Sequence, residues 1–196
     1  IFYLTGFLEN PGERFFAILL DENGNHKLFL NILFPLEEDL GLEIVSYSDT
    51  DDIISKVAEY IPDGTKLGID KILPARFLLP LMDKLPKTKF VDVSVLVDTT
   101  RMLKDEEEKE LMRISSELND KACQFVIDNI TEHTTEKDLV KKLLAYYEEI
   151  GVEGTSFAPI IAFGDNGANP HGMPGDRKPK PGESVIVDIG GIKDKY

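Results

Sequence analysis

Two short apolar runs near the end of the chain, separated by a long loop, constrain the fold more than any other feature. The runs are SFAPIIAFG (156–164) and SVIVDIGG (184–191), and each is bounded by Gly or Pro, as short strands often are. The segment between them, GDNGANPHGMPGDRKPKPGE (164–183), has about twenty residues, and loops of that length inside a compact domain are usually functional or disordered. We therefore expect two strands, and we look for functional side chains in the loop that joins them.

One histidine, His171, lies in that loop between Asn169-Pro170 and Gly172. A histidine in such a loop is commonly an exposed surface residue. The functional alternative is an imidazole that binds a substrate carbonyl or a developing oxyanion. The residues alone leave both interpretations open.

One carboxylate, Asp188, lies at the tip of the second run, after Val185, Ile186 and Val187 and before Ile189. These neighbours are apolar, so we expect Asp188 to lie among buried groups, where an ionised carboxylate is costly unless it is paired, hydrogen-bonded or bound to a metal. A cap or a salt bridge is the common use of such a residue, and a metal ligand is the alternative. The two glycines that follow allow other protein groups or a ligand to approach the backbone closely.

A long amphipathic helix is predicted upstream of these runs. The charge run LKDEEEKEL (103–111) places acidic residues where a helix N-terminus favours them, and Asp105 with Glu108 fits a capping-box variant. Apolar residues then recur every three or four positions as far as Ile130, which indicates one helix with an apolar face.

A second helix is expected to begin at Thr134 or Thr135 and to end at Gly151. We interpret both helices as core-packing elements. The charge run that opens the first of them marks the expected boundary between a domain of residues 1–100 and a domain of residues 101–196.

The first half of the chain alternates strand-like and helix-like pieces, which suggests an α/β architecture with helices packed on a sheet. Phe15 to Leu20 and Lys27 to Leu30 flank an Asn-Gly turn, and this combination indicates a β-hairpin. The other expected elements are a strand in IFYLTGF (1–7), a helix over 53–61 capped by Thr50 or Asp51, a strand KLGID (66–70), a helix PARFLLPLMDKLP (74–86) interrupted at Pro80, and a half-buried strand FVDVSVLVD (90–98).

Composition limits the possible partners and compartments. The net charge of −14 over 196 residues argues against a nucleic-acid partner and against docking on anionic lipid. The single cysteine, Cys123, cannot form an internal disulfide, and we expect it to be a buried, inert thiol in a reducing, cytoplasmic compartment. The longest purely apolar run, Phe15 to Leu20, is far too short for a membrane span.

The loop and the second run together resemble the catalytic core of the pita-bread metallopeptidases, in particular Xaa-Pro dipeptidase (prolidase) and aminopeptidase P. The family pattern is an apolar strand, a G-x-N-a-a-x-PH loop, and then G-D/E-x-V-x-x-D-x-G on the next strand. YLTGF and MLKDEEEKELMRISSELNDKA also look like this family, so the resemblance covers essentially the whole chain. The residues that match the loop-and-strand pattern are Gly164, Asn166, Pro170-His171, Gly182-Glu183 and Asp188 to Gly190.

The resemblance implies an α/β fold class, with an N-terminal creatinase/prolidase-like α/β domain followed by the first part of an α+β pita-bread domain. It implies a metal-dependent peptidase that hydrolyses Xaa-Pro bonds through a hydroxide activated by two divalent metal ions, with manganese expected first and cobalt or zinc as alternatives. Asp188 matches the first metal-binding aspartate of the family. His171 matches the histidine that contacts the substrate and stabilises the tetrahedral intermediate. The implied partners are an Xaa-Pro dipeptide or short peptide and a second copy of the chain in a homodimer.

The chain departs from the family pattern after Asp188. The family's second metal-binding aspartate, a later histidine and two glutamates have no counterpart before Tyr196. We therefore expect the chain to be a fragment clipped at both ends and inactive by itself.

Three rival functions remain. They are an aminopeptidase P that acts on longer peptides, a non-catalytic pita-bread protein used for binding or scaffolding, and a metal-free pita-bread enzyme that acts on a small amidine such as creatine. Asp188 beside two glycines counts against the last two. The motif NPHG (169–172) and the length of the N-terminal domain favour a dipeptidase over an aminopeptidase P.

Overall fold

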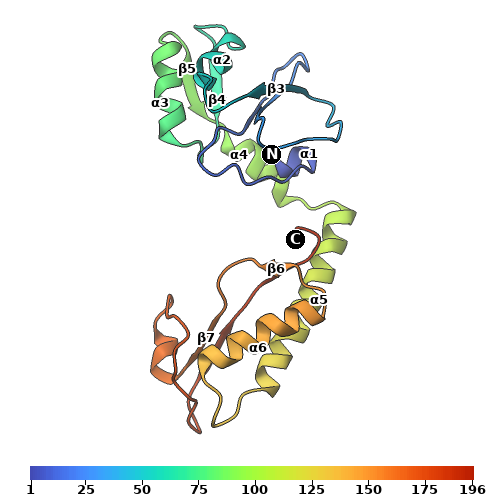
Figure 1. The fold of residues 1–196 in the computed structure, drawn as a ribbon, viewed down its shortest axis with the longest axis vertical. Coiled ribbons are helices and arrows are strands. Elements are labelled where there is room, and N and C mark those ends of the chain that lie inside the picture. Colours follow the sequence, from blue (N-terminus) through green and yellow to red (C-terminus); the bar gives the residue numbers. More distant parts are fainter. The chain divides into compact units, whose positions relative to one another are not determined.

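The computed structural model describes all residues from Ile1 to Tyr196, and the chain forms two compact units. The first unit comprises Ile1–Leu103 and the second Lys104–Tyr196. Both units mix helices and strands (Figure 1), which confirms the α/β fold class expected from the sequence. Each unit has its own hydrophobic cluster and is described by itself below.

The first unit consists of short strands and helices that alternate along the chain. A three-stranded sheet has the order β1-β2-β3, in which β1 is antiparallel and β3 parallel to the central strand, and a separate parallel pair joins β4 to β5. The elements are α1 (Phe2–Thr5), β1 (Ala17–Leu19), β2 (Lys27–Asn31), β3 (Glu43–Tyr47), α2 (Ile53–Glu59), β4 (Lys66–Ile69), α3 (Ala75–Lys84), β5 (Lys89–Asp92) and α4 (Ser94–Met102).

Aromatic side chains dominate the core of this unit. Phe15 meets Phe29 and Phe77 edge to face, with ring centroids 5.9 and 5.2 Å apart, which is the geometry that aromatic pairs prefer. The buried residues of the cluster come from the sheet, from helices α2 and α3 and from the segments that flank them; they are Phe15, Phe29, Tyr47, Ile54, Val57, Ile61, Leu81 and Leu85.

The predicted hairpin is confirmed, because β1 pairs antiparallel with β2 across the Asn-Gly turn. Gly24 has a φ of 84°, a conformation that glycine adopts without steric cost, and Asn23 N–H donates to Asp21 Oδ1 over 2.8 Å. The strand predicted at 66–70 is also present, as β4. Strand β3 was not predicted, although it lies parallel to β2 along its whole length.

Two details of the predicted helices were wrong. Helix α2 is capped by Asp52, whose side chain accepts from Ser55 N–H, and not by Thr50 or Asp51. Helix α3 runs through Pro80 without interruption. Pro80 lies on the exposed side of the helix, so water can satisfy the carbonyl group that loses its partner there.

Two predicted strands are wholly or partly helical in the structure. IFYLTGF contains helix α1, which ends at Gly6 with a φ of 72°. Of FVDVSVLVD, only the first residues are strand, because Asp92 Oδ1 accepts hydrogen bonds from Ser94 N–H (2.9 Å) and Ser94 Oγ (2.6 Å) at the start of α4. The side chains of Val95 and Leu96 are 64% and 66% exposed, so the apolar alternation that predicted a half-buried strand has no buried face.

The second unit packs two helices against a β-ribbon. Strands β7 and β8 are antiparallel with Ile160 opposite Asp188 and Phe163 opposite Val185, and a shorter antiparallel pair joins β6 to β9. Helices α5 and α6 lie against one another and α6 lies against β7 (Figure 1). The elements are α5 (Glu106–Asp128), α6 (Glu136–Glu149), β6 (Gly154–Thr155), β7 (Ile160–Phe163), the 3-10 helix η1 (Gly164–Ala168), β8 (Val185–Asp188) and β9 (Gly191–Ile192).

Both helices begin as the sequence predicts. Asp105 and Glu108 form a capping box at the start of α5, and Thr135 and Asp138 form another at the start of α6. The two strands predicted around the long loop are β7 and β8. These confirmations show how strongly capping chemistry and apolar runs specify local structure in this unit.

The β7–β8 ribbon has one face on the helices and one face away from them. Successive strand residues point to opposite sides, so Ile161 and Phe163 join Val187 on the helix side, where they pack in the core. Ile186 and Asp188 belong to the other side. The buried residues of this core are Ala122, Val126, Leu139, Leu143, Tyr147, Val152, Ile161 and Phe163.

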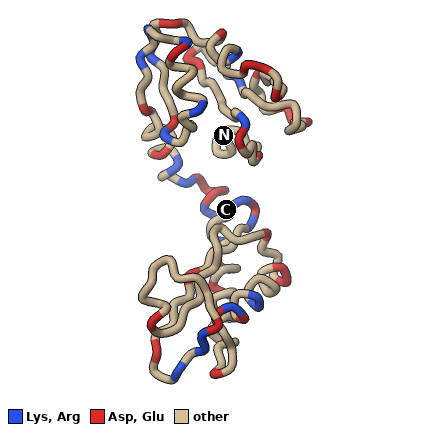
Figure 2. The backbone as a smooth tube through the Cα atoms, turned by 60° about the vertical axis from the view of Figure 1, so that its left-hand side comes forward, with Lys and Arg blue, Asp and Glu red and all other residues tan.

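Charge is spread over both units, with acidic residues in the majority and basic residues between them (Figure 2). Cys123 was expected to be buried, and in the structure it is partly buried. None of the helices combines the length and the apolar character that crossing a membrane requires.

Candidate functional site

His171 lies in the loop between η1 and β8, where a compact turn presents its side chain to solvent. His171 N–H donates to Asn169 Oδ1 over 3.0 Å, and Gly172 N–H donates to Asn169 O over 2.9 Å. The imidazole itself is exposed and takes part in no hydrogen bond or ion pair within the chain. The backbone of His171 is therefore held in place while its ring remains available to another molecule.

The turn is closed by the residues on either side of His171. Asn166 Nδ2 donates to Met173 O over 3.3 Å, which joins η1 to the segment after the histidine. Gly172 is buried, and a Cβ atom there would lie 3.0 Å from both Asn166 O and Asn166 Oδ1. A side chain at this position would be crowded against Asn166, so the glycine after His171 has a packing reason.

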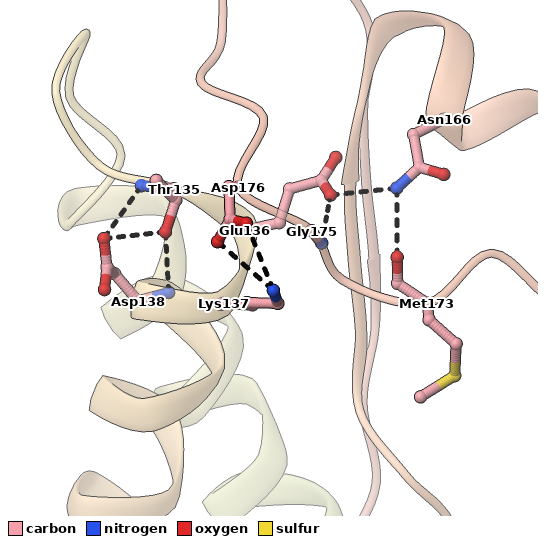
Figure 3. Close-up of polar contacts among 8 residues, drawn as sticks. All are labelled: Thr135, Glu136, Lys137, Asp138, Asn166, Met173, Gly175 and Asp176. Carbon is pink, nitrogen blue, oxygen red and sulfur yellow. Dashed lines mark hydrogen bonds and ion pairs between the residues drawn. The ribbon is translucent and has the colours of Figure 1, made fainter.

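The loop is anchored by a carboxylate that sequence reasoning did not identify, Glu136 in the first turn of α6 (Figure 3). Its side chain is fully buried. Oε1 accepts from Phe163 N–H at the end of β7 over 2.8 Å. Oε2 accepts from Asn166 Nδ2 over 2.9 Å and from Gly175 N–H over 2.7 Å. Hydrogen bonds to a charged acceptor are worth about 1.5–3 kcal/mol each, and three of them offset the cost of burying the group.

The backbone at the start of α6 holds the same loop. Glu136 N–H donates to Arg177 O over 3.2 Å, and Lys137 N–H donates to Gly175 O over 3.1 Å. These N–H groups have no partner inside the helix, because the first turn of any α-helix leaves its donors free. Lys137 also forms an exposed ion pair with Asp176 at 3.2 Å (Figure 3). The returning part of the loop is therefore attached to the helix through both backbone and side chains.

A second glutamate, Glu183, closes the far end of the loop. It accepts from Arg177 Nη2 over 2.6 Å and from Lys180 N–H over 3.1 Å. This pair packs over Gly164, whose φ is 49°, and a Cβ atom at that glycine would lie 2.6 Å from Arg177 Nη2. Arg177 Nε is buried and has no hydrogen-bond partner. Beyond η1 the loop is thus ordered by side-chain and backbone contacts rather than by further regular secondary structure.

Asp188 ends β8 opposite Ile160, and its carboxylate is exposed. The expectation that it lies among buried groups was wrong, because Val185 and Ile186 on the same strand are themselves 37% and 42% exposed. The carboxylate forms no hydrogen bond and no ion pair within the chain. Neither of the common uses of such a residue, a cap or a salt bridge, is therefore seen here.

The backbone just after Asp188 is fixed from the helix side. Asn119 Nδ2 donates to Ile189 O over 3.4 Å, and Tyr147 Oη donates to Asn119 Oδ1 over 2.8 Å. Burial raises the pKa of the Tyr147 phenol to about 12. The phenol therefore remains a hydrogen-bond donor to Asn119 at any physiological pH.

Protein groups lie close to the two glycines that follow Asp188. A side chain at Gly190 would collide with Ser156 and Phe157, and a Cβ atom at Gly191 would lie 2.9 Å from Val152 Cγ1. Of the two uses that the sequence allowed for this glycine pair, the structure shows close packing within the chain.

His171 lies in the loop that joins β7 to β8, and Asp188 lies in β8, but the two side chains make no hydrogen bond with each other. Asp188 is three positions along β8 from Val185, roughly 10 Å along the strand from the end where the loop joins it. An exposed carboxylate without a competing partner suits one ligand of a hard or borderline dication. No group of three or more His, Cys, Asp and Glu side chains gathers anywhere in the chain. Asp188 therefore fits the role of a single metal ligand, while the chain alone offers no complete metal centre.

Comparison with known proteins gives consistent matches over both units. The model of metallopeptidase family M24 matches residues 110–196, and that of the Creatinase/Prolidase N-terminal domain matches residues 1–103. An uncharacterized peptidase of Staphylococcus saprophyticus is 32% identical over 200 residues, which cover all of this chain and 56% of that protein.

Solved structures match over nearly the whole chain. The dipeptidase of Pyrococcus horikoshii OT3 is similar with a TM-score of 0.84 and 28% identity, covering 98% of this chain and 55% of its own. The prolidase of Pyrococcus furiosus is similar with a TM-score of 0.81 and 25% identity, covering 98% of this chain and 59% of its own. The chain spans about half the length of the relatives and structures that it matches.

Proposed function

Because the chain belongs to metallopeptidase family M24 and its residues 1–103 form a Creatinase/Prolidase N-terminal domain, we propose that the whole protein is a metal-dependent Xaa-Pro dipeptidase. The observation that carries the proposal is that the β7–β8 ribbon and the loop between its strands carry two exposed functional side chains. An exposed carboxylate without a partner, Asp188, ends β8, and a firmly anchored loop before β8 presents the exposed imidazole of His171. The similarity to a dipeptidase and a prolidase supports this choice of substrate.

In this proposal Asp188 supplies one oxygen ligand to a metal ion. Carboxylate oxygen is the donor that hard and borderline dications prefer, and the side chain has no hydrogen bond to give up when it binds one. Two divalent metal ions, when bound, would supply an activated water molecule and a positive charge at the scissile carbonyl. We propose manganese as the first metal to test, with cobalt and zinc as alternatives.

His171 is proposed to contact the substrate. Its backbone is held by Asn169 and by the anchored loop, so the exposed ring can donate a hydrogen bond to the carbonyl oxygen on which negative charge develops. Such a donor is effective when it is oriented in advance, because little reorganisation is then needed as the reaction proceeds. The anchored turn supplies that orientation.

The proposal extends to the assembly and location of the whole protein. A homodimer and a cytoplasmic location are the states we propose for a dipeptidase of this kind. A dimer would be seen as a doubled mass by light scattering of the whole protein, and a monomer at all concentrations would remove that part of the proposal.

The activity test uses the whole protein expressed from its complete coding sequence. After metal removal with a chelator, manganese, cobalt or zinc is added back separately, and release of the N-terminal residue Xaa is measured with an Xaa-Pro dipeptide and with a longer peptide that has proline second. We expect metal-dependent cleavage with a preference for the dipeptide. Cleavage of the longer peptide alone would indicate an aminopeptidase P, and no cleavage of either with any metal would leave a binding protein.

Two variants separate the proposed roles. Asp188→Asn should lower both the metal content and the activity, because an amide is a poorer ligand than a carboxylate. His171→Ala should retain metal but lose roughly 10²–10³-fold in kcat, the usual cost of removing one oxyanion donor. Glu148→Gln, at an exposed position of α6, is the matched control and should behave as the parent. Full metal content and activity in Asp188→Asn would remove Asp188 from the site.

A further inference from the structure

We propose that Glu136 is a positioning residue, whose buried carboxylate holds the loop that presents His171. The inference deepens the proposed function, since it rests on that function for the role of His171 as a substrate contact. The anchoring of the loop itself does not depend on any activity, so it can be tested by measurements other than catalysis.

One oxygen atom of Glu136 joins the two sides of the His171 turn. Oε2 accepts from Asn166 Nδ2, five residues before the histidine, and from Gly175 N–H, four residues after it, over 2.9 and 2.7 Å (Figure 3). Asn166 Nδ2 also donates to Met173 O, so the contacts form a closed set around the turn. Fixing both sides of a short segment removes most of its conformational freedom.

The other oxygen fixes the same turn to the sheet. Oε1 accepts from Phe163 N–H, the last residue of β7, over 2.8 Å. Phe163 is fully buried in the core of the second unit, so it is a rigid reference point. The carboxylate therefore sets where the loop begins relative to β7 and where it returns.

A carboxylate is the side chain that this position requires. All of its partners are N–H donors, and a carboxylate is an acceptor at both oxygens. A glutamine of the same shape would turn an NH₂ group toward at least one of these donors and leave that donor unsatisfied. The first turn of α6 also favours a negative charge, because the helix has its positive dipole end there.

Glu136 acts on His171 indirectly, through Asn166 and the backbone of the loop. No hydrogen bond joins the two side chains, and the imidazole is exposed whereas the carboxylate is fully buried. By contrast, Glu183 binds Arg177 and Lys180, which both follow the turn. Glu136 is thus the one acid whose contacts enclose the histidine.

The first experiment uses the whole protein with Glu136→Gln, and with Glu148→Gln as the matched control on the same helix. The readouts are the amide hydrogen exchange of residues 163–175 and the imidazole NMR signals of His171, with His26 in the first unit as an internal reference. We expect at least roughly tenfold faster exchange at Phe163 and Gly175 in Glu136→Gln and a changed His171 signal, because the loop opens locally. The His26 signal and the control variant should match the parent.

A second variant tests the same proposal in case Glu136→Gln fails to fold. Asn166→Ala keeps the buried carboxylate but removes one of its two contacts to the turn, and it should change the His171 signal in the same direction with a smaller effect on Phe163. Parent-like exchange at Gly175 together with a parent-like His171 signal in both variants would overturn the proposal.

A double-variant cycle in the whole protein then tests the effect on catalysis. Glu136→Gln should lower kcat/KM by roughly 10- to 100-fold, the size expected for a small misplacement of a reacting group. In a His171→Ala background the same change should cost little more, because the two residues act as one unit. Equal losses with and without His171 would overturn the positioning role. An inactive parent protein would contradict the proposed dipeptidase function, while the exchange and NMR results would still decide whether Glu136 holds the loop.

Discussion

The two units differ in where they place their charged groups, although each buries a hydrogen-bonded tyrosine. Tyr47 in the first unit donates to Phe15 O over 2.7 Å, and Tyr147 in the second donates to Asn119 Oδ1 over 2.8 Å. The first unit keeps an ion pair held by two hydrogen bonds, Arg14 with Asp49, near the surface. The second unit buries a carboxylate, Glu136, completely.

This difference indicates what each arrangement is for. An exposed ion pair joins segments at modest free-energy cost and contributes modestly when formed. A buried carboxylate stabilises only if every donor around it is in place, so it specifies one arrangement of the loop it binds. The second unit, which carries the candidate site, uses the more demanding arrangement.

The largest expected effect comes from removing the buried carboxylate. Glu136→Ala leaves Phe163 N–H, Gly175 N–H and Asn166 Nδ2 without their acceptor, and should destabilise the second unit by on the order of 3 kcal/mol or more. Hydrogen exchange resolved by peptide measures the two units separately. Glu149→Ala, exposed on the same helix, is the control. An equal loss of protection in residues 1–103 would show that the effect is not confined to the second unit.

A smaller effect should follow from removing either buried phenol. Tyr147→Phe and Tyr47→Phe each lose one hydrogen bond and should cost about 1 kcal/mol in the free energy of unfolding of their own unit. Urea unfolding followed by exchange in each unit would measure this. If one variant loses several times more free energy of unfolding than the other, the acceptor left behind in that variant, Asn119 Oδ1 or Phe15 O, finds no other donor.

The phenol of Tyr147 also gives a prediction at alkaline pH. Burial raises the pKa of Tyr147 from 10.0 to about 12, so its contribution to stability is complete below pH 10 and is lost as the pH rises through 12. Burial also raises the pKa of Tyr47. Tyrosinate absorbance should therefore show late-titrating phenols in the parent, and the phenol that titrates near pH 12 should be absent from Tyr147→Phe. An unchanged titration curve in that variant would assign the late phenol to another tyrosine.

The smallest effect is expected at the exposed pair of the first unit. The hydrogen bond from Arg14 holds the pKa of Asp49 below its ordinary value of 3.8, so this contribution is present above pH 3.8 and is lost as the pH falls through the lower pKa. Arg14→Gln should therefore make unfolding of the first unit slightly less sensitive to acid. The measurement is the urea midpoint of the first unit at a mildly and at a strongly acidic pH, in the parent and in Arg14→Gln. If the difference between the two midpoints is the same in both proteins, the ion pair contributes nothing measurable to stability.

Local chemistry allowed much of the fold to be predicted. The hairpin at the Asn-Gly turn, the capping box at Asp105, and the strands on either side of the long loop are all present. Each depends on interactions between residues close in sequence, such as a cap with its helix or a turn with its flanking strands. Predictions failed at 94–98, where apolar alternation suggested a strand but Asp92 and Ser94 start a helix whose Val95 and Leu96 are exposed.

The candidate site divides in the same way. A motif in the sequence was enough to select His171 and Asp188 as candidates, because the residue types and their spacing resemble a known pattern. The tertiary structure alone revealed Glu136, which is 27 residues from Phe163 and 39 from Gly175 in the chain and resembles any acidic residue in a first helical turn. It also showed that Asp188 is exposed although its neighbours are apolar. Burial and long-range hydrogen bonds depend on which segments fold against each other, and no pattern of adjacent residues determines that.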